Sequence, residues 1–440
     1  MQRTWSGPER EGDEHVAKVR TIDDVVTSQL CTGCGACAYM EPDRYRMVDD
    51  LGLGRRPIPL VDDASGPDLA MQVCPGHSLG HDSYVEDEVS PRTVLPAWGP
   101  IRKVWEGHAS DPEIRFAGSS GGAATALALY SIERQGLHGV LHVDKDPERP
   151  YLNHTVLSST RRELLRATGS RYAPASPCDR LDLIENAPRK CVFIGKPCDV
   201  AAVQAARRLI PRLDSNLGPV IAFFCAGTPS TRGTLDLLAR VGVSEIDSVT
   251  DIRYRGNGWP GEWTVNFQSP EGEQARVLSY EDSWGFLERY RQWRCYICPD
   301  HTGEFADVAV GDPWYRRPQP GEHGSSLILA RTQAGLDLVL AAEQAGYLTL
   351  ENSDAEILPA SQPNLLNARG RLWGQLVTLR SMGVATPTYR NMPTFRVWLR
   401  ALDWKDKIRS ITGTIRRVFR RKLHRRVSVR PLVSSHPREN

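Results

Sequence analysis

The sequence predicts an α/β protein with a cysteine-rich module before its main domain. Two observations lead to this prediction. Between residues 101 and 350, short apolar runs pass through turns into helical patterns, which is the alternation typical of sheets with much parallel pairing. Ahead of that region, residues 31–37 read CTGCGAC, so that three cysteines follow one another at a spacing of C-x2-C-x2-C.

The composition is that of a folded protein larger than one domain. The chain has 440 residues, of which 40% are hydrophobic and 25% charged. The sequence has no uninterrupted run of about 18 apolar residues, the length needed to cross a membrane, and its polar first residues do not resemble a signal peptide. We therefore expect a cytoplasmic location. Because cytoplasmic thiols stay reduced, the ten cysteines are expected to bind metal or to carry redox chemistry.

The first four cysteines define the N-terminal module. Cys31, Cys34 and Cys37 are followed by Cys74, which precedes a proline, and this order resembles that of ferredoxin-type iron–sulfur ligands. Three thiolates on one loop suit a cubane cluster, in which each iron takes its own sulfur. A zinc ion, which usually takes two C-x2-C pairs, and unrelated buried thiols are the alternatives.

The elements that follow alternate between strands and helices. A linker rich in proline and glycine, residues 89–100, separates the module from a region that begins near Ile101. The clearest elements beyond it are a helix, a strand and two strand–turn–helix units, at residues 116–136, 139–143, 191–209 and 220–242.

The first of these helices is entered through a loop of glycines and serines, AGSSGG, residues 117–122. Its hydroxyls and N–H groups would lie at the positive end of the helix dipole, which suits a phosphate or pyrophosphate. A plain helix cap, whose glycines allow close packing, is the alternative. The loop has neither G-x-G-x-x-G nor a Walker lysine, so by itself it identifies no nucleotide.

The later cysteines predict a second set of ligands. Cys198 and Cys225 each lie in the turn after a predicted strand, and such turns gather at the carboxyl edge of a parallel sheet. Cys295 and Cys298 form a C-x2-C before a proline, so these four thiols are expected to meet. A zinc knuckle or idle buried thiols are the alternatives. The other two cysteines are an expected core residue and an unassigned thiol, Cys191 and Cys178 respectively.

Several separated stretches together resemble the beta subunit of coenzyme F-420 (F420) hydrogenases and dehydrogenases, a family whose relatives include 7-hydroxymethyl chlorophyll a reductase. The stretches follow the family's order within about residues 20–350: SSGGAATALALY, TGSRYAPAS, FIGKPCDVAAV, FFCAGTPS, YRGNGW, CYICPD and ADVAVGDPW. This ordered set is more specific than any one motif. Beyond NLLNARGR we recognise no resemblance.

The resemblance implies an α/β (α+β) flavoprotein core with an N-terminal ferredoxin-like iron–sulfur module. Residues 1–95 would hold a polar lead-in and the first 4Fe–4S cluster, and residues 96–180 the first part of the flavin-binding domain. Residues 181–355 would hold its second part with the second cluster, and residues 356–440 a C-terminal extension with a basic amphipathic tail.

The resemblance also implies which residues hold the cofactors. The loop and the GSRY segment would border FAD, through Ser119, Ser120, Gly121, Gly122, Thr125, Arg171 and Tyr172. Lys196 would place a cation beside a cluster or the flavin ring, and Arg255 is a further cation for the reduced flavin. The two 4Fe–4S clusters would take Cys31, Cys34, Cys37 and Cys74, and Cys198, Cys225, Cys295 and Cys298.

These features predict an oxidoreductase that passes electrons between coenzyme F420 or a ferredoxin, FAD and the two clusters. Its substrate and its catalytic residues are not identified by the motifs. FAD suits the role because it exchanges both hydrides and single electrons. A non-catalytic electron-transfer subunit of a larger redox complex is the alternative, and a colourless zinc-stabilised scaffold is a third. The expected partners are a redox protein or ferredoxin and a deazaflavin, and no nucleic acid.

The C-terminal tail is strongly basic. Residues 401–430 carry eleven Lys or Arg against two Asp, although the net charge of the whole chain is only +2. Apolar residues at nearly helical spacing, with Trp398 and Trp404 as anchors, predict an amphipathic helix along Leu399, Leu402, Ile408, Ile411, Ile415 and Val418. Peripheral contact with the inner membrane surface is one expectation, and a solvated tail or a docking site for an acidic redox partner are the others.

Overall fold

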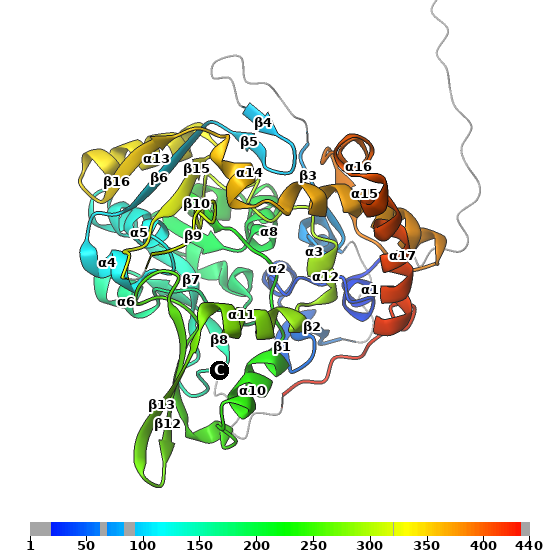
Figure 1. Cartoon of the computed structure of the whole chain (residues 1–440), viewed down its shortest axis with the longest axis horizontal. Helices are drawn as coiled ribbons and strands as arrows, with labels where there is room; N and C mark the ends of the chain where they lie inside the picture. Colours follow the sequence, from blue (N-terminus) through cyan, green and yellow to red (C-terminus); the bar gives the residue numbers. More distant parts are fainter. Residues whose placement is uncertain (1–18, 62–67, 83–92, 320, 433–440) are drawn as a thin grey trace, which may run out of the picture.

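An eight-stranded mixed sheet forms the centre of the molecule (Figure 1). The computed structural model describes residues 19–61, 68–82, 93–319 and 321–432. The strand order is β16-β6-β15-β14-β10-β9-β7-β8. The central strands β14, β10, β9 and β7 are parallel and the others pair antiparallel. In chain order the strands are β6 Lys103–Ala109, β7 Gly139–Lys145, β8 Asn153–Ser158, β9 Cys191–Gly195, β10 Leu217–Phe223, β14 Val308–Gly311, β15 Ser326–Ala330 and β16 Leu348–Ser353.

Helices cover both faces of this sheet because its strands bury side chains on both sides. Along β15, Leu327 and Leu329 join one apolar core and Ile328 joins the other. The first core is covered by α7 Asp182–Glu185, α8 Pro197–Arg207, α9 Pro211–Asn216 and α14 Ile357–Ser361. The second is covered by α4 Pro112–Ala117, α5 Ala123–Glu133, α6 Arg161–Arg166 and α13 Gln333–Gln344. The predicted α/β layering is thus confirmed.

The elements predicted from the sequence are present. The predicted helix within 116–136 is α5, and the predicted strand 139–143 lies within β7. The two strand–turn–helix units are β9 with α8 and β10 with α10, which spans Thr231–Arg240. Each strand is a short apolar run buried between helices, so the local pattern was sufficient to predict it.

A small antiparallel sheet interrupts the chain after α10. Its strands are β11 Val249–Arg253, β12 Glu262–Ser269 and β13 Gly272–Ser279, and its β12–β13 hairpin projects from the body (Figure 1). Trp263 and Tyr254 form its core with Leu237 of α10. The chain then passes through α11 Tyr280–Leu287 to α12 Trp293–Tyr296. After this insertion the chain comes back to the large sheet with Cys295 and Cys298.

The cysteine module packs against helices from the other end of the chain. It consists of α1 Ile22–Thr27, α2 Ala36–Met40, β1 Tyr45–Asp50, β2 Gly54–Pro59 and α3 Leu69–Val73. The C-terminal helices are α15 Leu365–Ser381, α16 Phe395–Ala401 and α17 Trp404–Arg421. Val25 of α1 shares an apolar core with Leu376 of α15 and Val418 of α17. In Figure 1 the first segments, in blue, accordingly lie beside the last, in red.

Backbone pairing strengthens this association of the two ends. Strand β17, Thr388–Arg390, pairs with β3, Ser78–Gly80. After α17 the chain runs back along the module, where Val427 N donates to Thr27 O at 2.9 Å. The tail after α17 is therefore held by the module along its described length, to residue 432, unlike a freely solvated tail.

A hairpin joins the module to the large sheet. Residues 89–92 of the predicted linker lie outside the described residues, and the rest forms β4 Thr93–Leu95 and β5 Gly99–Ile101. Trp98 in its turn is buried, and its carbonyl accepts a hydrogen bond of 2.9 Å from Arg331. This part of the linker is therefore packed structure.

The predicted apolar stripe of the tail needs a correction. It divides between α16 and α17, and Leu402 and Val418 are buried in the core. Trp398 is half-buried, with its ring 4.5 Å from that of Trp373. The apolar residues that α17 exposes are Trp404, Ile408, Ile411, Ile415 and Phe419. Within the described ranges, no helix is long and apolar enough to span a bilayer.

Candidate functional site

The first cysteine group consists of Cys31, Cys34, Cys37 and Cys74, and the structure brings all four together. Burial, with smaller contributions from Asp199 and the Cys31 thiol, raises the pKa of the Cys34 thiol to about 12. Burial also raises the pKa of Cys37, with added repulsion from the other three thiols. Gly33 N donates to Cys31 Sγ at 3.3 Å. The group is a set of thiols close enough for their charges to interact.

A tight loop places these thiols. Gly35, which precedes α2, has a φ of +91°, in the left-handed region that glycine adopts readily. A Cβ at Gly35 would lie 2.7 Å from Asp179 N, so the loop presses against residues 176–179 of the main domain. Ser176 Oγ donates to Gly33 O at 2.7 Å across the same contact. The first group is thus held against the large sheet's domain.

The second cysteine group consists of Cys198, Cys225, Cys295 and Cys298, which also meet. Cys198 lies in the first turn of α8 after β9, and Cys225 follows β10, so neighbouring parallel strands deliver both. Burial raises the pKa of the Cys225 thiol to about 12 and that of Cys298 to about 11, and in each case Cys295 adds repulsion. Cys198 interacts with Cys225 and Cys298 in the same way.

Backbone hydrogen bonds fix the second group on both sides. Cys225 N donates to His301 O at 2.9 Å, just beyond Cys298. Thr228 N donates to Cys295 Sγ at 3.4 Å, and Gln292 N donates to Thr228 O at 3.1 Å. The segment after β10 is therefore held against the segment that carries the C-x2-C pair.

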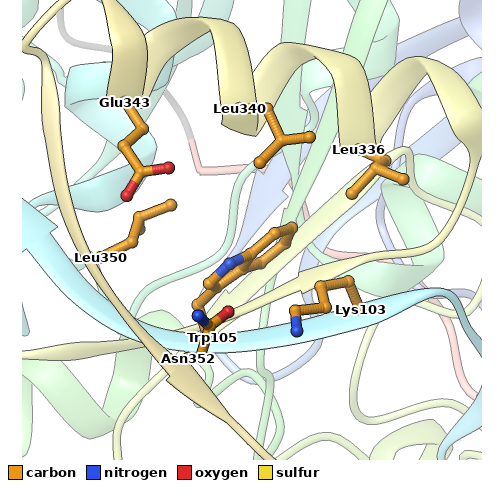
Figure 2. A pocket seen from close by; sticks show the side chains of 7 residues that line it. All are labelled: Lys103, Trp105, Leu336, Leu340, Glu343, Leu350 and Asn352. Atoms are coloured by element: carbon orange, nitrogen blue, oxygen red, sulfur yellow. The ribbon is translucent and has the colours of Figure 1, made fainter.

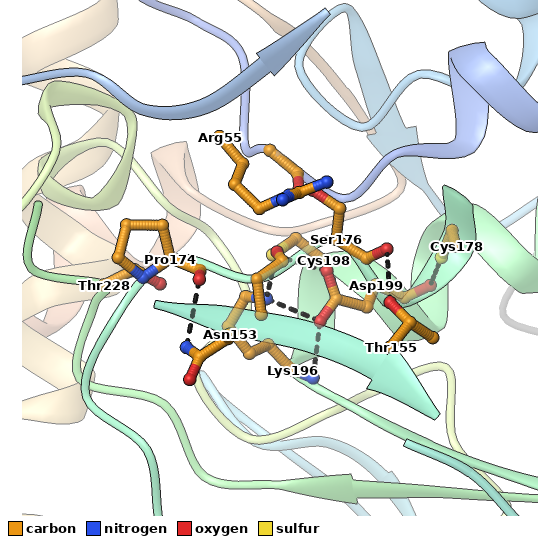
Figure 3. Close-up of polar contacts among 12 residues, drawn as sticks. Arg55, Asn153, Thr155, Pro174, Ser176, Cys178, Lys196, Cys198, Asp199 and Thr228 are labelled. Carbon is orange, nitrogen blue, oxygen red and sulfur yellow. Dashed lines mark hydrogen bonds and ion pairs between the residues drawn. The ribbon is translucent and has the colours of Figure 1, made fainter. Parts of the chain in front are cut away.

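Two cations border the second group. Lys196 Nζ lies 2.6 Å from Asp199 Oδ2. Figure 3 marks this ion pair with a dashed line. Burial lowers the pKa of Lys196, but the Asp199 carboxylate and the thiols of Cys198 and Cys225 raise it above its usual range. Arg294 lies near the thiols of the group, and its buried Nε has no hydrogen-bond partner in the described part of the chain. Sequence reasoning missed Arg294, although it directly precedes Cys295.

Cys178 lies between the two groups. Its N–H donates to Cys34 O at 2.9 Å, and its thiol donates to Asp199 O at 3.4 Å, next to Cys198 (Figure 3). Arg294 makes a second link, because its Nη2 donates to Pro75 O at 3.0 Å, one residue after Cys74. The two cysteine groups are therefore neighbours.

All ten cysteines are free thiols. Cys191 is buried in the first core, on β9, as expected. No set of three or more His, Cys, Asp or Glu side chains within the described ranges is arranged to hold a single metal ion. In a cubane site, by contrast, each thiolate binds a separate iron.

The loop before α5 is bonded to two other segments. Ser119 Oγ accepts a hydrogen bond of 2.6 Å from Ser170 N. Ser120 Oγ lies 2.9 Å from Ser326 Oγ, at the start of β15. Thr125 Oγ1 lies 3.4 Å from Thr168 Oγ1. These hydroxyls gather at the start of α5, where no side chain caps the helix.

The two glycines of this loop are required by packing. A Cβ at Gly121 would lie 2.8 Å from Gly107 O, and one at Gly122 would lie 2.6 Å from Ile114 O. Gly121 N already donates to Ser326 Oγ at 2.8 Å. Both glycines therefore allow close packing, which was the alternative to a phosphate site. Their contact with a cofactor stays a prediction.

The predicted cofactor residue Arg171 is held by neutral acceptors. Its guanidinium donates to Ile252 O at 2.8 Å, to Pro150 O at 2.6 Å and to Asn153 Oδ1 at 2.5 Å. Burial lowers its pKa. The neighbouring Tyr172 has its ring 4.8 Å from that of Trp284. A hollow of about 30 Å³ beside this segment has room for a water molecule.

Two motifs that are far apart in the sequence meet beside this segment. Arg255 of YRGNGW forms a bidentate ion pair with Asp312 of GDPW, at 2.7 and 2.9 Å. Trp259 Nε1 donates to the same carboxylate at 2.8 Å. The guanidinium also lies 4.6 Å from the centre of the Tyr280 ring. The sequence placed both motifs in one family pattern but did not predict that they pair.

Another hollow lies away from the thiols. It has a volume of about 300 Å³ and opens between α13 and the strands β6 and β16 (Figure 2). Its lining is mostly apolar and holds no cysteine, and it consists of Lys103, Trp105, Leu336, Leu340, Glu343, Leu350 and Asn352. None of the predicted site residues is among them.

Comparison with known proteins identifies matching family profiles. The coenzyme F420 hydrogenase/dehydrogenase, beta subunit N-terminal profile matches residues 104–181, and the C-terminal profile matches residues 188–356. A structure of the F420-reducing nickel–iron hydrogenase complex from Methanosarcina barkeri aligns with a TM-score of 0.48 and 18% identity, over 70% of this chain and 99% of that chain.

Curated relatives carry related names. The coenzyme F420 hydrogenase subunit beta of Methanococcus voltae is 27% identical over 66% of this chain and 99% of its own length. The F420-dependent formate dehydrogenase subunit beta of Methanocaldococcus jannaschii is 25% identical over 55% of this chain and 60% of its own length. The coenzyme F420-dependent sulfite reductase of the same organism is 23% identical, over 75% of this chain and 48% of its own length. The chain belongs to the coenzyme F420 hydrogenase/dehydrogenase beta subunit family.

Proposed function

We propose that this chain transfers electrons between coenzyme F420, FAD and two 4Fe–4S clusters as part of an oxidoreductase. The main support is the gathering of eight cysteines, from five separate stretches, into two neighbouring groups of four. Family membership supports the redox role, because relatives are named as subunits of F420-dependent hydrogenase and formate dehydrogenase and as an F420-dependent sulfite reductase.

The first group fits a 4Fe–4S cluster by its chemistry. The charges of its four thiols interact, and backbone N–H groups of Ala36 and Ala38 lower the pKa of Cys34 and Cys37 against the larger effect of burial. Such donors stabilise the thiolate form in which cysteine binds iron. A bound metal would also reverse the repulsion between the thiolates, since its own charge dominates such a site.

The second group fits a cluster in a more cationic environment. Lys196 is paired with Asp199, whereas Arg294 interacts with the thiols of Cys295 and Cys298 and its buried Nε has no hydrogen-bond partner among the described residues. A cation and a free N–H donor at that place would offset the negative charge of four thiolates, and such contacts set the potential of a cluster.

The contact between the groups would allow electrons to pass from one to the other. Cys34 is bonded through its backbone to Cys178, and the Cys178 thiol is bonded to Asp199, which adjoins Cys198. Along that line, the residues between Cys34 and Cys198 are Cys178 and Asp199. The chain's role in this proposal is to hold both groups rigidly and to keep water away.

The proposed FAD site is the start of α5 and the loop of residues 168–172. The hydroxyls of Ser119, Ser120 and Thr125 and the uncapped first turn of α5 are the donors that a pyrophosphate takes. FAD there would exchange hydrides with a deazaflavin and single electrons with a cluster. The hollow of about 30 Å³ is far smaller than FAD, so this loop would have to move or the cofactor would lie across it.

Among the candidate cations for a reduced flavin, Arg171 suits the role best. Lys196 and Arg255 are each paired with a carboxylate, of Asp199 and Asp312 respectively. The hydrogen bonds of Arg171 all go to neutral oxygens, so its charge is not cancelled by a bonded carboxylate. We therefore propose Arg171 as the cation that would favour an anionic reduced cofactor.

A non-catalytic subunit remains the second candidate. Two relatives that match over 99% and 74% of their own length are each named as a coenzyme F420 hydrogenase subunit beta. Under this reading the chain would pass electrons to a separate catalytic protein and would have no substrate of its own. A ferredoxin could serve as its donor in place of F420.

The test is cofactor content followed by turnover. We expect the anaerobically purified chain to be brown and to contain about eight iron and eight sulfide, with one FAD. Reduced F420 should then be oxidised by the chain alone with a dye as electron acceptor. Cofactor-loaded protein without this activity would favour the non-catalytic subunit, and a colourless protein with zinc would refute the redox proposal.

A further inference from the structure

Helix α17 presents a row of apolar side chains to the outside of the molecule. Trp404 and Phe419, at its two ends, are 68% and 64% exposed, and Ile408 between them is 50% exposed. Ile411 and Ile415 complete the row, which we call the outer stripe. At spacings of three and four residues, these five side chains lie along one side of the helix. Figure 1 shows α17 at the edge of the molecule.

The inward side of α17 is already occupied. Ser410, Thr414 and Val418 are buried against the rest of the protein. Asp406 also points inward, where its carboxylate pairs with Arg371 of α15 at 2.8 Å. The usual arrangement of a surface helix is thus reversed in part, because small polar residues are buried and large apolar ones are exposed. The outer stripe is therefore not explained by packing within the described chain.

Cations flank the outer stripe. Helix α17 carries seven Lys or Arg and a single acidic residue, Asp406, which is turned inward. Lys405, Arg409, Arg416 and Arg420 are exposed. Arg421, by contrast, stacks inward, with its guanidinium 4.5 Å from the centre of the Tyr296 ring. The outward part of the helix is apolar along its middle and positive along its side.

We propose that the outer stripe and its flanking cations bind the surface of an anionic lipid bilayer. A basic amphipathic helix with aromatic residues at its apolar face lies in the plane of the interface, with that face buried below the headgroups. From Trp404 to Phe419 the stripe is about 22 Å long. Lys405, Arg409, Arg416 and Arg420 would meet lipid phosphates on the same side.

The charges of α17 favour an anionic bilayer over a second copy of the chain or an acidic protein. A second copy of the chain, packed stripe to stripe, would bring two rows of cations together without an exposed acid of α17 to offset them. An acidic protein would satisfy the cations but gives no reason for five exposed apolar side chains in line. An anionic bilayer accounts for both the flanking cations and the outer stripe. The proposal does not depend on the cofactors, because α17 contains none of the cysteines.

The experiment is flotation of the full chain with lipid vesicles. We expect the protein to float with mixed phosphatidylglycerol–phosphatidylcholine vesicles and not with phosphatidylcholine alone. Binding should fall at least roughly tenfold at high salt, because exposed charges are screened beyond about 3 Å at 1 M. Equal binding to both kinds of vesicle, or no binding to either, would overturn the proposal.

Two sets of variants separate the apolar and the charged contributions. Replacing Ile408, Ile411 and Ile415 with Ser should weaken binding at least roughly tenfold, because each buried apolar group adds to membrane affinity. The matched control is Val277→Ser on β13, since Val277 is 50% exposed like Ile408, and it should bind as the parent does. Binding unchanged in the triple Ser variant would refute the stripe as the contact.

Variants that remove charge test the proposal independently, in case the triple Ser variant misfolds. Arg409, Arg416 and Arg420 changed together to Gln should lose roughly 100-fold in affinity, at about 1 kcal/mol for each cation. The control changes three exposed arginines elsewhere to Gln, Arg162, Arg180 and Arg212, and should retain binding. Circular dichroism checks that each variant is folded, and sedimentation measures its oligomeric state. A dimer that the triple Ser variant loses, without vesicle binding by the parent, would assign the stripe to a second copy instead.

Discussion

The two cysteine groups have the same number of thiols but are built in different ways. The first comes from two stretches of the chain, and three of its four members lie within Cys31–Cys37 on a loop and a short helix. The second draws on three segments, with Cys198 and Cys225 after neighbouring strands, Cys295 in α12 and Cys298 just after that helix. A local spacing positions the first, whereas the sheet and the return of the chain position the second.

This difference predicts how each group responds to change. Damage to the large sheet's edge should affect the second group and spare the first, which depends on its own loop. The two are nevertheless in contact, through Cys34 and Cys178 and through Arg294 and Pro75. Variants can therefore show whether they behave as two sites or as one.

The largest effect is expected from loss of one ligand in each group. Cys37→Ser and Cys225→Ser should each lower the iron content by about half, from about eight to about four. Iron and sulfide analysis of anaerobically purified protein measures this. Cys191→Ser is the control, because Cys191 is a buried cysteine of the core on β9 and belongs to neither group, and this variant should keep all its iron. Loss of all iron in either ligand variant would show that the two groups form only together.

Damage to the sheet edge should separate the two groups. A Cβ at Gly303 would lie 2.3 Å from the Cβ of Ala222 on β10, so Gly303→Ala should displace the segment that holds Cys298 and His301. We expect iron to fall toward half, while the first cluster's spectrum is retained.

The control for this variant is Gly346→Ala. Gly346 has a φ of +79°, close to the +74° of Gly303, but no atom lies within 4 Å of the position of its added Cβ. It should therefore suffer the same backbone strain, about 1 kcal/mol, and keep its iron. If both variants retain equal iron, the second group does not depend on this contact.

A smaller effect should follow from removing the charge of Arg294. Arg294→Gln is expected to lower the reduction potential of the second cluster by on the order of 50 mV, because a nearby cation stabilises the added electron. A redox titration in the Cys37→Ser background measures the second cluster alone. Arg294→Lys keeps the charge and should restore most of the potential. A shift confined to the Cys225→Ser background would place Arg294 with the first cluster instead.

The smallest effect is expected at Cys178, between the groups. Because Cys178 is bonded to Cys34 and to Asp199, the neighbour of Cys198, but is a ligand of neither group in our proposal, Cys178→Ala should keep all iron. It removes a buried sulfur atom, so the free energy of unfolding should fall by about 1 kcal/mol. Iron analysis and chemical denaturation measure the two quantities. A loss of iron would indicate that Cys178 is a ligand and would contradict the assignment of four cysteine ligands to each cluster.

Much of the fold could be predicted from the sequence because its signals are local. The strands β7, β9 and β10 are short apolar runs, and the glycine and proline turns after β9 and β10 lead into helices. The same units placed Cys198 and Cys225 on one sheet edge, where the structure has them. Their role as ligands stays a prediction.

Other features could not be predicted, because residues far apart in the chain make them. The pairing of Arg255 with Asp312 joins two motifs 57 residues apart. The position of Cys178 depends on how the module docks, and so does the fit of Gly35 against Asp179. The packing of α15 and α17 on the cysteine module has no local signal.

By itself, the sequence determined the α/β layering, the family and the spacing of the first thiols, since each is encoded in neighbouring residues or in the order of short motifs. Only the tertiary structure decided that the two cysteine groups are neighbours and that Gly121 and Gly122 are needed for packing. It also decided that α17 buries Ser410 and exposes Ile408. Helical spacing defines an apolar stripe, but which side of a helix faces the protein depends on the partner against which it packs.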